Sequence, residues 1–230
     1  MRAKRIVVAI DGPAGAGKST VARRVADRLG FVYINTGAMY RAVTLWALRN
    51  GTDLSDMHRL ERLAQEAKIE FSVGDGRVFL NAEDVTDLLY RPEISAASSK
   101  VSAVGGVRRA LVARQRAIAQ NASVVMEGRD IGTAVCPEAD VKIFLDADAP
   151  ERAQRRAREM QGKGEAVDVA SVAVEIEERD ERDKTRLESP LIQAPDAHLL
   201  DTTGKTLEQV EDEVLRLIRS RVSNGKEVHR

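Results

Sequence analysis

The segment Gly12–Ser19, which reads Gly-Pro-Ala-Gly-Ala-Gly-Lys-Ser, constrains the fold more than any other stretch of the chain. It follows a short apolar run, Ile6–Ile10, and it opens a helical pattern over Lys18–Leu29. Three glycines so close together allow the backbone to turn sharply, because glycine adopts left-handed conformations at little cost. A buried strand, a glycine turn and a helix in this order are typical of parallel α/β folds.

Four more apolar runs are short and nearly continuous rather than alternating, as expected of strands buried on both faces. They occupy residues 31–34, 124–126, 141–145 and 198–200. Helical patterns lie between and after them, at 38–49, 107–120, 151–160 and 206–218. Strands that alternate with helices form a parallel sheet covered on both faces, so the sequence predicts an α/β fold with five parallel strands.

Residues 68–87 interrupt this alternation. Ile69–Val73, a glycine turn at 74–76 and Val78–Leu80 are typical of a β-hairpin, and Val85 is expected in a third short strand. The pattern predicts a small antiparallel insert. A mere surface decoration is the alternative, since long insertions in surface loops cost little free energy.

The composition argues against several classes of protein. The chain of 230 residues has 36 basic and 36 acidic side chains and only eight aromatic ones, unlike a protein that coats nucleic acid. One cysteine and three histidines argue against a disulfide scaffold and a zinc site. No apolar run approaches ~18 residues, so no membrane span is expected. The first run stops at Asp11, too early for a signal peptide, which makes a cytoplasmic location the default expectation.

The glycine turn matches the pattern G-x-x-x-x-G-K-[ST] of phosphate-binding loops (P-loops), in the strand–loop–helix context that the pattern requires. Backbone N–H groups and the positive end of the helix would surround phosphate oxygens. Lys18 would reach the β- and γ-phosphates, and the Ser19 hydroxyl would face Mg²⁺. The sequence therefore predicts a nucleoside triphosphate bound with Mg²⁺. The residues expected to bind it are Gly12, Pro13, Ala14, Gly15, Ala16, Gly17, Lys18, Ser19 and Thr20.

Other nucleotide-binding classes lack their signatures in this chain. There is no Asn-Lys-x-Asp, as in guanine-binding switch proteins, and no run of four apolar residues ends in Asp-Glu, as in motor and transporter ATPases. Arginines near the ends of the expected elements favour phosphoryl transfer, which depends on positioning and charge neutralisation. Each arginine alone could be an ordinary surface residue. They are Arg41, Arg108, Arg129, Arg155, Arg179 and Arg186.

Three further motifs give the chain a resemblance to a known family. They are Asn35–Arg41, Glu127–Asp130 and Glu178–Arg186. With the glycine loop, and in this order, they resemble the motifs of bacterial cytidylate kinases, from about Ile6 to Thr203. One departure is Asn35-Thr36, where many relatives have Asp-Ser.

The resemblance implies a P-loop kinase of one domain over residues 1–230, with the five strands in the order 2-3-1-4-5. An insert at 62–98 would bind the monophosphate, and a lid with its following helix would span 150–186. The implied reaction transfers the γ-phosphate of ATP to CMP, and to dCMP, with Mg²⁺ as cofactor. A monomer is expected, with no nucleic-acid polymer and no membrane as partner. Lys18, Arg129 and Arg186 would be the catalytic residues.

The resemblance also implies a binding site for CMP. Cytosine presents an amino donor at N4 and acceptors at N3 and O2, so a selective site needs an acceptor opposite N4 and donors opposite the others. By resemblance Asp130 is the acceptor, and Ser99 and Arg108 are the donors. Arg155 would reach the phosphates of ATP, and Glu127 would lie either behind Mg²⁺ or in a structural role. The expected CMP-binding residues are Thr36, Arg41, Ser99, Arg108, Arg129, Asp130, Arg179, Asp183 and Arg186.

Simpler structural interpretations exist for several of these residues. Thr36 could merely cap a helix, and Ser99 could pack within a run of small residues. Arg108 could lie on a solvated helix face. Arg179 and Asp183, four residues apart, could form a weak surface ion pair.

Two alternative functions also follow from the loop alone. The first is another small-molecule kinase of the adenylate or shikimate type. The second is a non-catalytic, nucleotide-dependent binding module, which would have no need of a second set of arginines for another phosphate.

Overall fold

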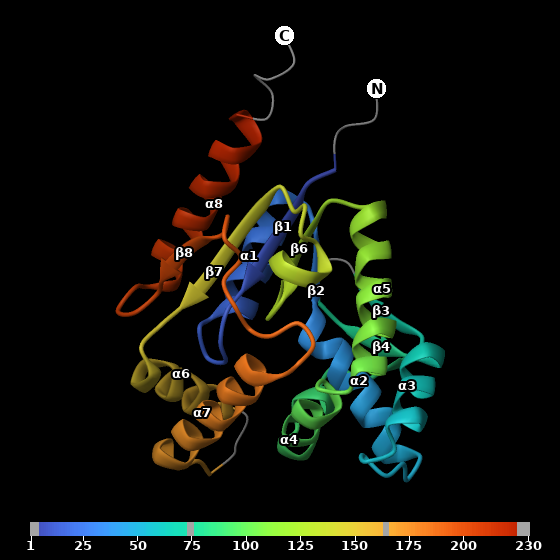
Figure 1. Ribbon diagram of the computed structural model, residues 1–230. Helices are drawn as coiled ribbons and strands as arrows, with labels where there is room; N and C mark the ends of the chain where they lie inside the picture. Colours follow the sequence, from blue (N-terminus) through green and yellow to red (C-terminus); the bar gives the residue numbers. More distant parts are fainter. Residues whose placement is uncertain (1–4, 73–75, 163–165, 225–230) are drawn as a thin grey trace.

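In the computed structural model, which describes residues 5–72, 76–162 and 166–224, the chain folds around one parallel sheet (Figure 1). Its strands are β1 (Val7–Asp11), β2 (Val32–Asn35), β6 (Val124–Gly128), β7 (Val141–Asp146) and β8 (His198–Asp201). They lie in the order β2-β6-β1-β7-β8, and every neighbouring pair is parallel. Numbered along the chain this order is 2-3-1-4-5, so the predicted fold class and strand order are confirmed.

The register of the sheet places the carboxyl ends of three strands side by side. Asp11, at the end of β1, pairs with Gly128 in β6, and Asn35, at the end of β2, pairs with Glu127. Ligands of open α/β sheets bind beyond this edge. The register therefore brings polar residues from three separate parts of the sequence to one place.

Helices cover both faces of this sheet. They are α1 (Lys18–Leu29) and α8 (Leu207–Asn224) on one face, and α5 (Gly105–Asn121) with the π-helical turn η2 (Ile131–Val135) on the other. Because successive side chains of a strand point to opposite faces, Ile10 is buried beneath the first pair and Ala9 beneath the second.

A second lobe follows β2 along the chain. It consists of α2 (Thr36–Arg49), α3 (Met57–Glu66), β3 (Ile69–Phe71), β4 (Val78–Leu80), β5 (Glu83–Asp84), the 3-10 turn η1 (Leu88–Tyr90) and α4 (Pro92–Val101). The strands form an antiparallel sheet in the order β3-β4-β5, as predicted for the insert. Residue 73 of the expected first strand and residues 74–75 of the expected turn lie outside the described residues, and Val85 follows β5 instead of belonging to it. Leu80 and Val85 share a buried core with Leu60 of α3.

Two helices of this lobe, α3 and α4, were not expected from the sequence. α4 begins with Pro92 at its first turn, where proline is favoured because its missing N–H would have no partner there. None of the helices within the described residues is long and apolar enough to span a membrane.

Two further helices lie against each other below the carboxyl edge of the sheet (Figure 1). They are α6 (Ala149–Gln161) and α7 (Val169–Thr185). Ala153 and Val172 pack between them, and Ala14 of the glycine loop packs against this small cluster. Residues 163–165, between the two helices, lie outside the described residues.

Candidate active site

The glycine loop connects β1 to α1 in the way that its sequence predicts. Gly12 has a φ of 147°, and a Cβ there would lie 1.9 Å from the carbonyl oxygen of Leu145 in β7. Gly15 has a φ of 77°, and its Cβ would lie 2.7 Å from the carbonyl oxygen of Arg152 in α6. Both positions therefore require glycine, which lets the loop pass close to the sheet and to α6.

Lys18 lies across this loop. Its side chain is buried, and its Nζ donates to the carbonyl oxygen of Pro13 at 2.6 Å. Burial, together with the nearby guanidinium of Arg129, lowers the pKa of Lys18 to about 7. An anionic ligand beside the ammonium group would favour its charged form and so raise this pKa again.

This pKa gives a test of the predicted Mg²⁺–nucleotide site: binding of Mg²⁺–ATP there should take up a proton at alkaline pH. Lys18 is mostly neutral in the free protein at about pH 8.5, whereas the phosphates restore its charge, so close to one proton should enter with the nucleotide. At about pH 6 the lysine is already charged, and uptake through it should vanish. Calorimetry in buffers of different ionisation enthalpy measures this uptake. Equal uptake by Lys18→Met would contradict the assignment.

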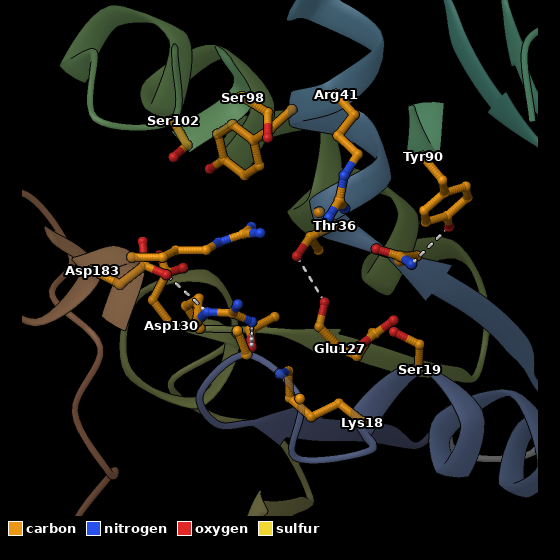
Figure 2. A pocket seen from close by; sticks show the side chains of 18 of the residues that line it. Lys18, Ser19, Thr36, Arg41, Tyr90, Ser98, Ser102, Glu127, Asp130 and Asp183 are labelled. Carbon is orange, nitrogen blue, oxygen red and sulfur yellow. Dashed lines mark hydrogen bonds and ion pairs between the residues drawn. The ribbon is translucent and has the colours of Figure 1, made fainter. Parts of the chain in front are cut away.

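Two adjoining pockets open beside the loop. The first lies between the loop, the end of β6, and helices α2, α4, α5 and α7 (Figure 2). The second lies over α1, next to α6 and the segment 202–210. The residues that line both pockets are Gly15, Lys18, Ser19, Tyr90, Arg156 and Glu159. A group bound in one pocket can therefore contact a group bound in the other.

The first pocket brings together most of the residues predicted to bind CMP. They are Thr36, Arg41, Arg108, Arg129, Asp130, Arg179, Asp183 and Arg186. Ser99 does not line it: its hydroxyl is buried with no hydrogen-bond partner, while Ser98 and Ser102 of the same region face the pocket. Sequence reasoning therefore found the helix that borders the pocket but not its pocket-facing serines.

The second pocket contains most of the residues predicted to bind ATP. Residues 15–20 and Arg155 line it, Ala14 lines the first pocket, and Gly12 and Pro13 line neither. The Arg155 guanidinium donates to the hydroxyl oxygen of Thr202 at 2.8 Å and to the Thr202 carbonyl oxygen at 2.7 Å. These two bonds hold the Arg155 side chain beside the glycine loop, at the second pocket.

A chain of buried ion pairs forms the floor of the first pocket. Asp130 accepts from Arg108 and, at 3.3 Å, from Arg186. Asp183 accepts from Arg129 at 2.9 Å and from Arg186 at 3.4 Å. Arg108 is only 2 % exposed, so its interpretation as a solvated residue is wrong. Two carboxylates thus fix three arginines in place.

Two more arginines of the pocket have no carboxylate partner among the described residues. Arg41 and Arg179 both have a buried Nε without a hydrogen-bond partner. Burial lowers the pKa of Arg41, and burial with the positive charge of Arg129 lowers the pKa of Arg179 to about 9. Arg179 and Asp183 do not form the simple surface ion pair considered as an alternative, because Asp183 binds Arg129 and Arg186. Desolvated cations without partners favour an anion between them.

Asp11 positions the segment that carries Asp130. Its carboxylate accepts from the N–H groups of Ile131 at 2.8 Å and Gly132 at 2.7 Å. Burial raises the pKa of Asp11 to about 6. These two bonds fix the backbone directly after Asp130, so Asp11 belongs to the support of the site although sequence reasoning missed it.

Thr36 and Glu127 join α2 to β6. The Thr36 hydroxyl donates to the carbonyl oxygen of Glu127 at 2.7 Å, and the Glu127 carboxylate accepts from Tyr33 at 2.7 Å. Thr36 is therefore not the helix cap. That role belongs to Asn35, whose side chain accepts from the N–H of Ala38 at 2.9 Å.

Sequence reasoning also missed Tyr90, Arg156 and Glu159 at the junction of the pockets. Arg156 and Glu159 form an ion pair of 2.9 Å on α6. The arginine-rich composition of 151–158 could have drawn attention to Arg156 beside Arg155. Tyr90 gave no signal, because nothing in the sequence indicates which side chain of a short turn faces a pocket.

Comparison with known proteins agrees with this geometry. The family model described as cytidylate kinase matches residues 8–220. The chain belongs to the cytidylate kinase family. A cytidylate kinase of Solibacter usitatus is 57% identical over 226 residues, which cover 97% of each chain. One of Pelotomaculum thermopropionicum is 50% identical, covering 95% of this chain and 96% of its own.

Among solved structures, a gluconokinase from Sinorhizobium meliloti 1021 is 16% identical, with a TM-score of 0.50, and covers 98% of this chain and 100% of its own. This likeness concerns the fold alone. Membership of the cytidylate kinase family confirms the prediction of an ATP-dependent enzyme that phosphorylates CMP to CDP. Neither the adenylate- or shikimate-type kinase nor the non-catalytic module gains support from it.

Proposed function

We propose that the chain transfers the γ-phosphoryl group of ATP to CMP and dCMP, with Mg²⁺, across the junction of the two pockets. The observation that carries this proposal is the pairing of a P-loop with a second phosphate site. Lys18 and Ser19 line both pockets, and Arg41 and Arg179, which have no carboxylate partner among the described residues, lie in the first. An ATP-hydrolysing module would need no second cationic site.

On the donor side, we propose that residues 12–20 hold the phosphates of ATP and that Arg155 contacts them from α6. Lys18 would lie between the β- and γ-phosphates. The residues fit Mg²⁺ that arrives with the nucleotide, because Ser19 presents one hydroxyl oxygen at the start of α1. The described residues contain no group of three acidic, histidine or cysteine side chains that could hold a metal alone. Mg²⁺ usually binds through substrate phosphates and few protein oxygens, and it would neutralise charge on the transferred group.

On the acceptor side, we propose that Arg41, Arg129 and Arg179 bind the phosphate of CMP. Asp130, Arg108 and Ser99 stay our candidates for the cytosine, with Ser98 and Ser102 as pocket-facing neighbours of Ser99. We assign Thr36, Asp183 and Arg186 to the ribose and the phosphate. The charge of these side chains, and the position of all but Ser99 in the first pocket, support these proposals.

The proposed mechanism needs no general base, because the attacking phosphate oxygen of CMP is already anionic. Lys18, Arg129 and Arg186 would hold the two phosphate groups in line and stabilise the charge of the transition state. All three lie within or beside the chain of ion pairs that fixes the pocket. Positioning and electrostatics therefore account for the proposed catalysis.

A panel of acceptors tests the proposal. ADP release with Mg²⁺–ATP should be fast with CMP and dCMP, and it should be at least ~10-fold slower with UMP, AMP and GMP, since a site built to bind a polar group rejects partners lacking it. The ratio of CMP to dCMP measures the contribution of the ribose hydroxyl. Equal rates with all five acceptors would contradict the assignment of the base site.

We also propose that the single domain contains the monophosphate-binding insert at 62–98 and a mobile lid with its following helix at 150–186, of which residues 163–165 lie outside the described residues. Support comes from the contacts of the lid with the P-loop: Arg152 donates to the carbonyl oxygen of Ala14 at 3.0 Å, and Asp180 accepts from the Ala14 N–H at 3.1 Å. Phosphates that bind beside this loop would act on both helices.

Hydrogen exchange tests the lid. Protection over 150–186 should rise when a bisubstrate analogue binds and rise less with ATP alone, because Arg179 and Asp183 are assigned to the acceptor side. Exchange in 212–220 of α8, which lines neither pocket, should not respond and serves as the internal control. Equal protection of 150–186 in all states would favour a static helix pair.

The monomeric state and the cytoplasmic location stay predictions. Light scattering coupled to gel filtration measures the first.

A further inference from the structure

Tyr90 occupies a special place in the insert. It is the last residue of η1, and within the described part of 62–98 it alone lines both pockets. The neighbouring Thr86 and Asp87 line only the second pocket, and Ser98 lines only the first. Tyr90 is therefore the side chain by which the insert reaches the place of phosphoryl transfer.

Two contacts connect Tyr90 to the acceptor side (Figure 2). Its hydroxyl oxygen accepts from Nδ2 of Asn35 at 3.3 Å. Its ring faces the guanidinium of Arg41, with Cζ 5.3 Å from the ring centroid. The side-chain oxygen Oδ1 of Asn35 caps α2, the helix that carries Arg41. One tyrosine thus contacts both the start of α2 and the arginine on its second turn.

The kind of contact matters for the charge of Arg41. A carboxylate in this place would neutralise the guanidinium and compete with a phosphate. An aromatic face attracts a cation without removing its charge or using its N–H donors. The buried Nε of Arg41 makes no hydrogen bond, so its donors stay available for an incoming anion.

We infer that Tyr90 is a positioning residue for the acceptor phosphate, which orients the Arg41 guanidinium and makes this orientation depend on docking of the insert. The inference rests on the proposed function, since it takes the phosphate of CMP as the anion. It also gives Asn35 a role. An amide can accept from the N–H of Ala38 and donate to Tyr90 at once, whereas an aspartate at this position could not donate.

Two substitutions separate the contacts of Tyr90. Tyr90→Leu removes the ring and should raise KM for CMP by about 5- to 30-fold, with KM for ATP within about twofold of the wild type. Tyr90→Phe keeps the ring, loses the hydroxyl and with it the bond to Asn35, and should raise KM for CMP by about 2- to 5-fold. Direct titration with CMP should follow the same order as KM.

Phe79→Leu is the matched control. Phe79 belongs to β4 of the same insert and lies under the guanidinium of Arg77, at 5.6 Å, without lining either pocket. Its replacement removes an aromatic–arginine contact of the same kind. KM for CMP and KM for ATP should both stay unchanged in this variant.

A double-mutant cycle with Arg41→Lys distinguishes positioning from general structural support. If Tyr90 acts through Arg41, the loss caused by Arg41→Lys should be at least about threefold smaller in the Tyr90→Leu background than in the wild type. Additive losses would overturn the inference, and so would equal rises in KM for CMP and ATP. If Tyr90→Leu does not fold, Tyr90→Phe decides the question. An unchanged KM for CMP in a folded Tyr90→Phe variant, together with an unchanged loss on Arg41→Lys in that background, would reject the inference. A wild-type chain inactive with CMP would instead overturn the proposed function.

Discussion

Lys18→Ala should lower kcat by about 10²- to 10³-fold, as expected for loss of an electrostatic contact to the transferred phosphoryl group. Lys18 lies at the junction of both pockets, held to the carbonyl oxygen of Pro13 at 2.6 Å. In the proposed function, its charge would contact phosphates bound in either pocket. Steady-state ADP release with saturating ATP and CMP measures the effect.

The fold should not suffer from this change. Since burial lowers the pKa of Lys18 to about 7, the folded state disfavours its ammonium group, and removal of the group should not lower the unfolding temperature. Lys142→Ala is the control, because Lys142 pairs with Asp196 at 2.8 Å and lines neither pocket. Lys18→Ala retaining more than half of wild-type turnover would contradict the role of the P-loop in transfer.

The sheet and the P-loop could be predicted because both leave recognisable patterns in the sequence. Strands of a parallel sheet are buried on both faces, and this leaves continuous apolar runs such as Val141–Leu145. Gly12 and Gly15 mark positions where any side chain would collide with the backbone of β7 or α6. The apolar runs and the spacing of the glycine loop are local patterns, so a single sequence displays them, although the contacts of Gly12 and Gly15 themselves are with distant residues.

The supports of the site could not be predicted, because they join residues far apart in the chain. Asp11 binds Ile131 across 120 positions, and Asn35 binds Tyr90 across 55. No residue near Asp11 in the sequence indicates which backbone N–H groups its carboxylate will bind. The interpretation of Thr36 as the cap of α2 fails for the same reason. Its hydroxyl donates to the carbonyl oxygen of Glu127 in a distant strand, and Asn35 caps the helix instead.

The pairing of Asp130 carries the second large expected effect. Asp130 lies between Arg108 and Arg186, and all three side chains are at most 7 % exposed. Removing one partner from such a buried set is costly, so Asp130→Ala should lower the free energy of unfolding by about 3–5 kcal/mol. Denaturant unfolding measures this loss. Glu83→Ala, which removes one partner of the exposed pair Arg49–Glu83, should lower the free energy of unfolding far less.

Asp130→Asn separates recognition of the base from stability. The amide keeps the size of the side chain and one acceptor oxygen, but it can also turn to donate its N–H₂ group. Cytosine needs an acceptor opposite N4, whereas uracil has an acceptor at position 4 and needs a donor there. We therefore expect kcat/KM for CMP to fall by about 10- to 100-fold, with a smaller fall for UMP and no change in KM for ATP. If CMP and UMP lose activity equally and KM for ATP rises with them, Asp130 only supports the arginines and does not contact the base.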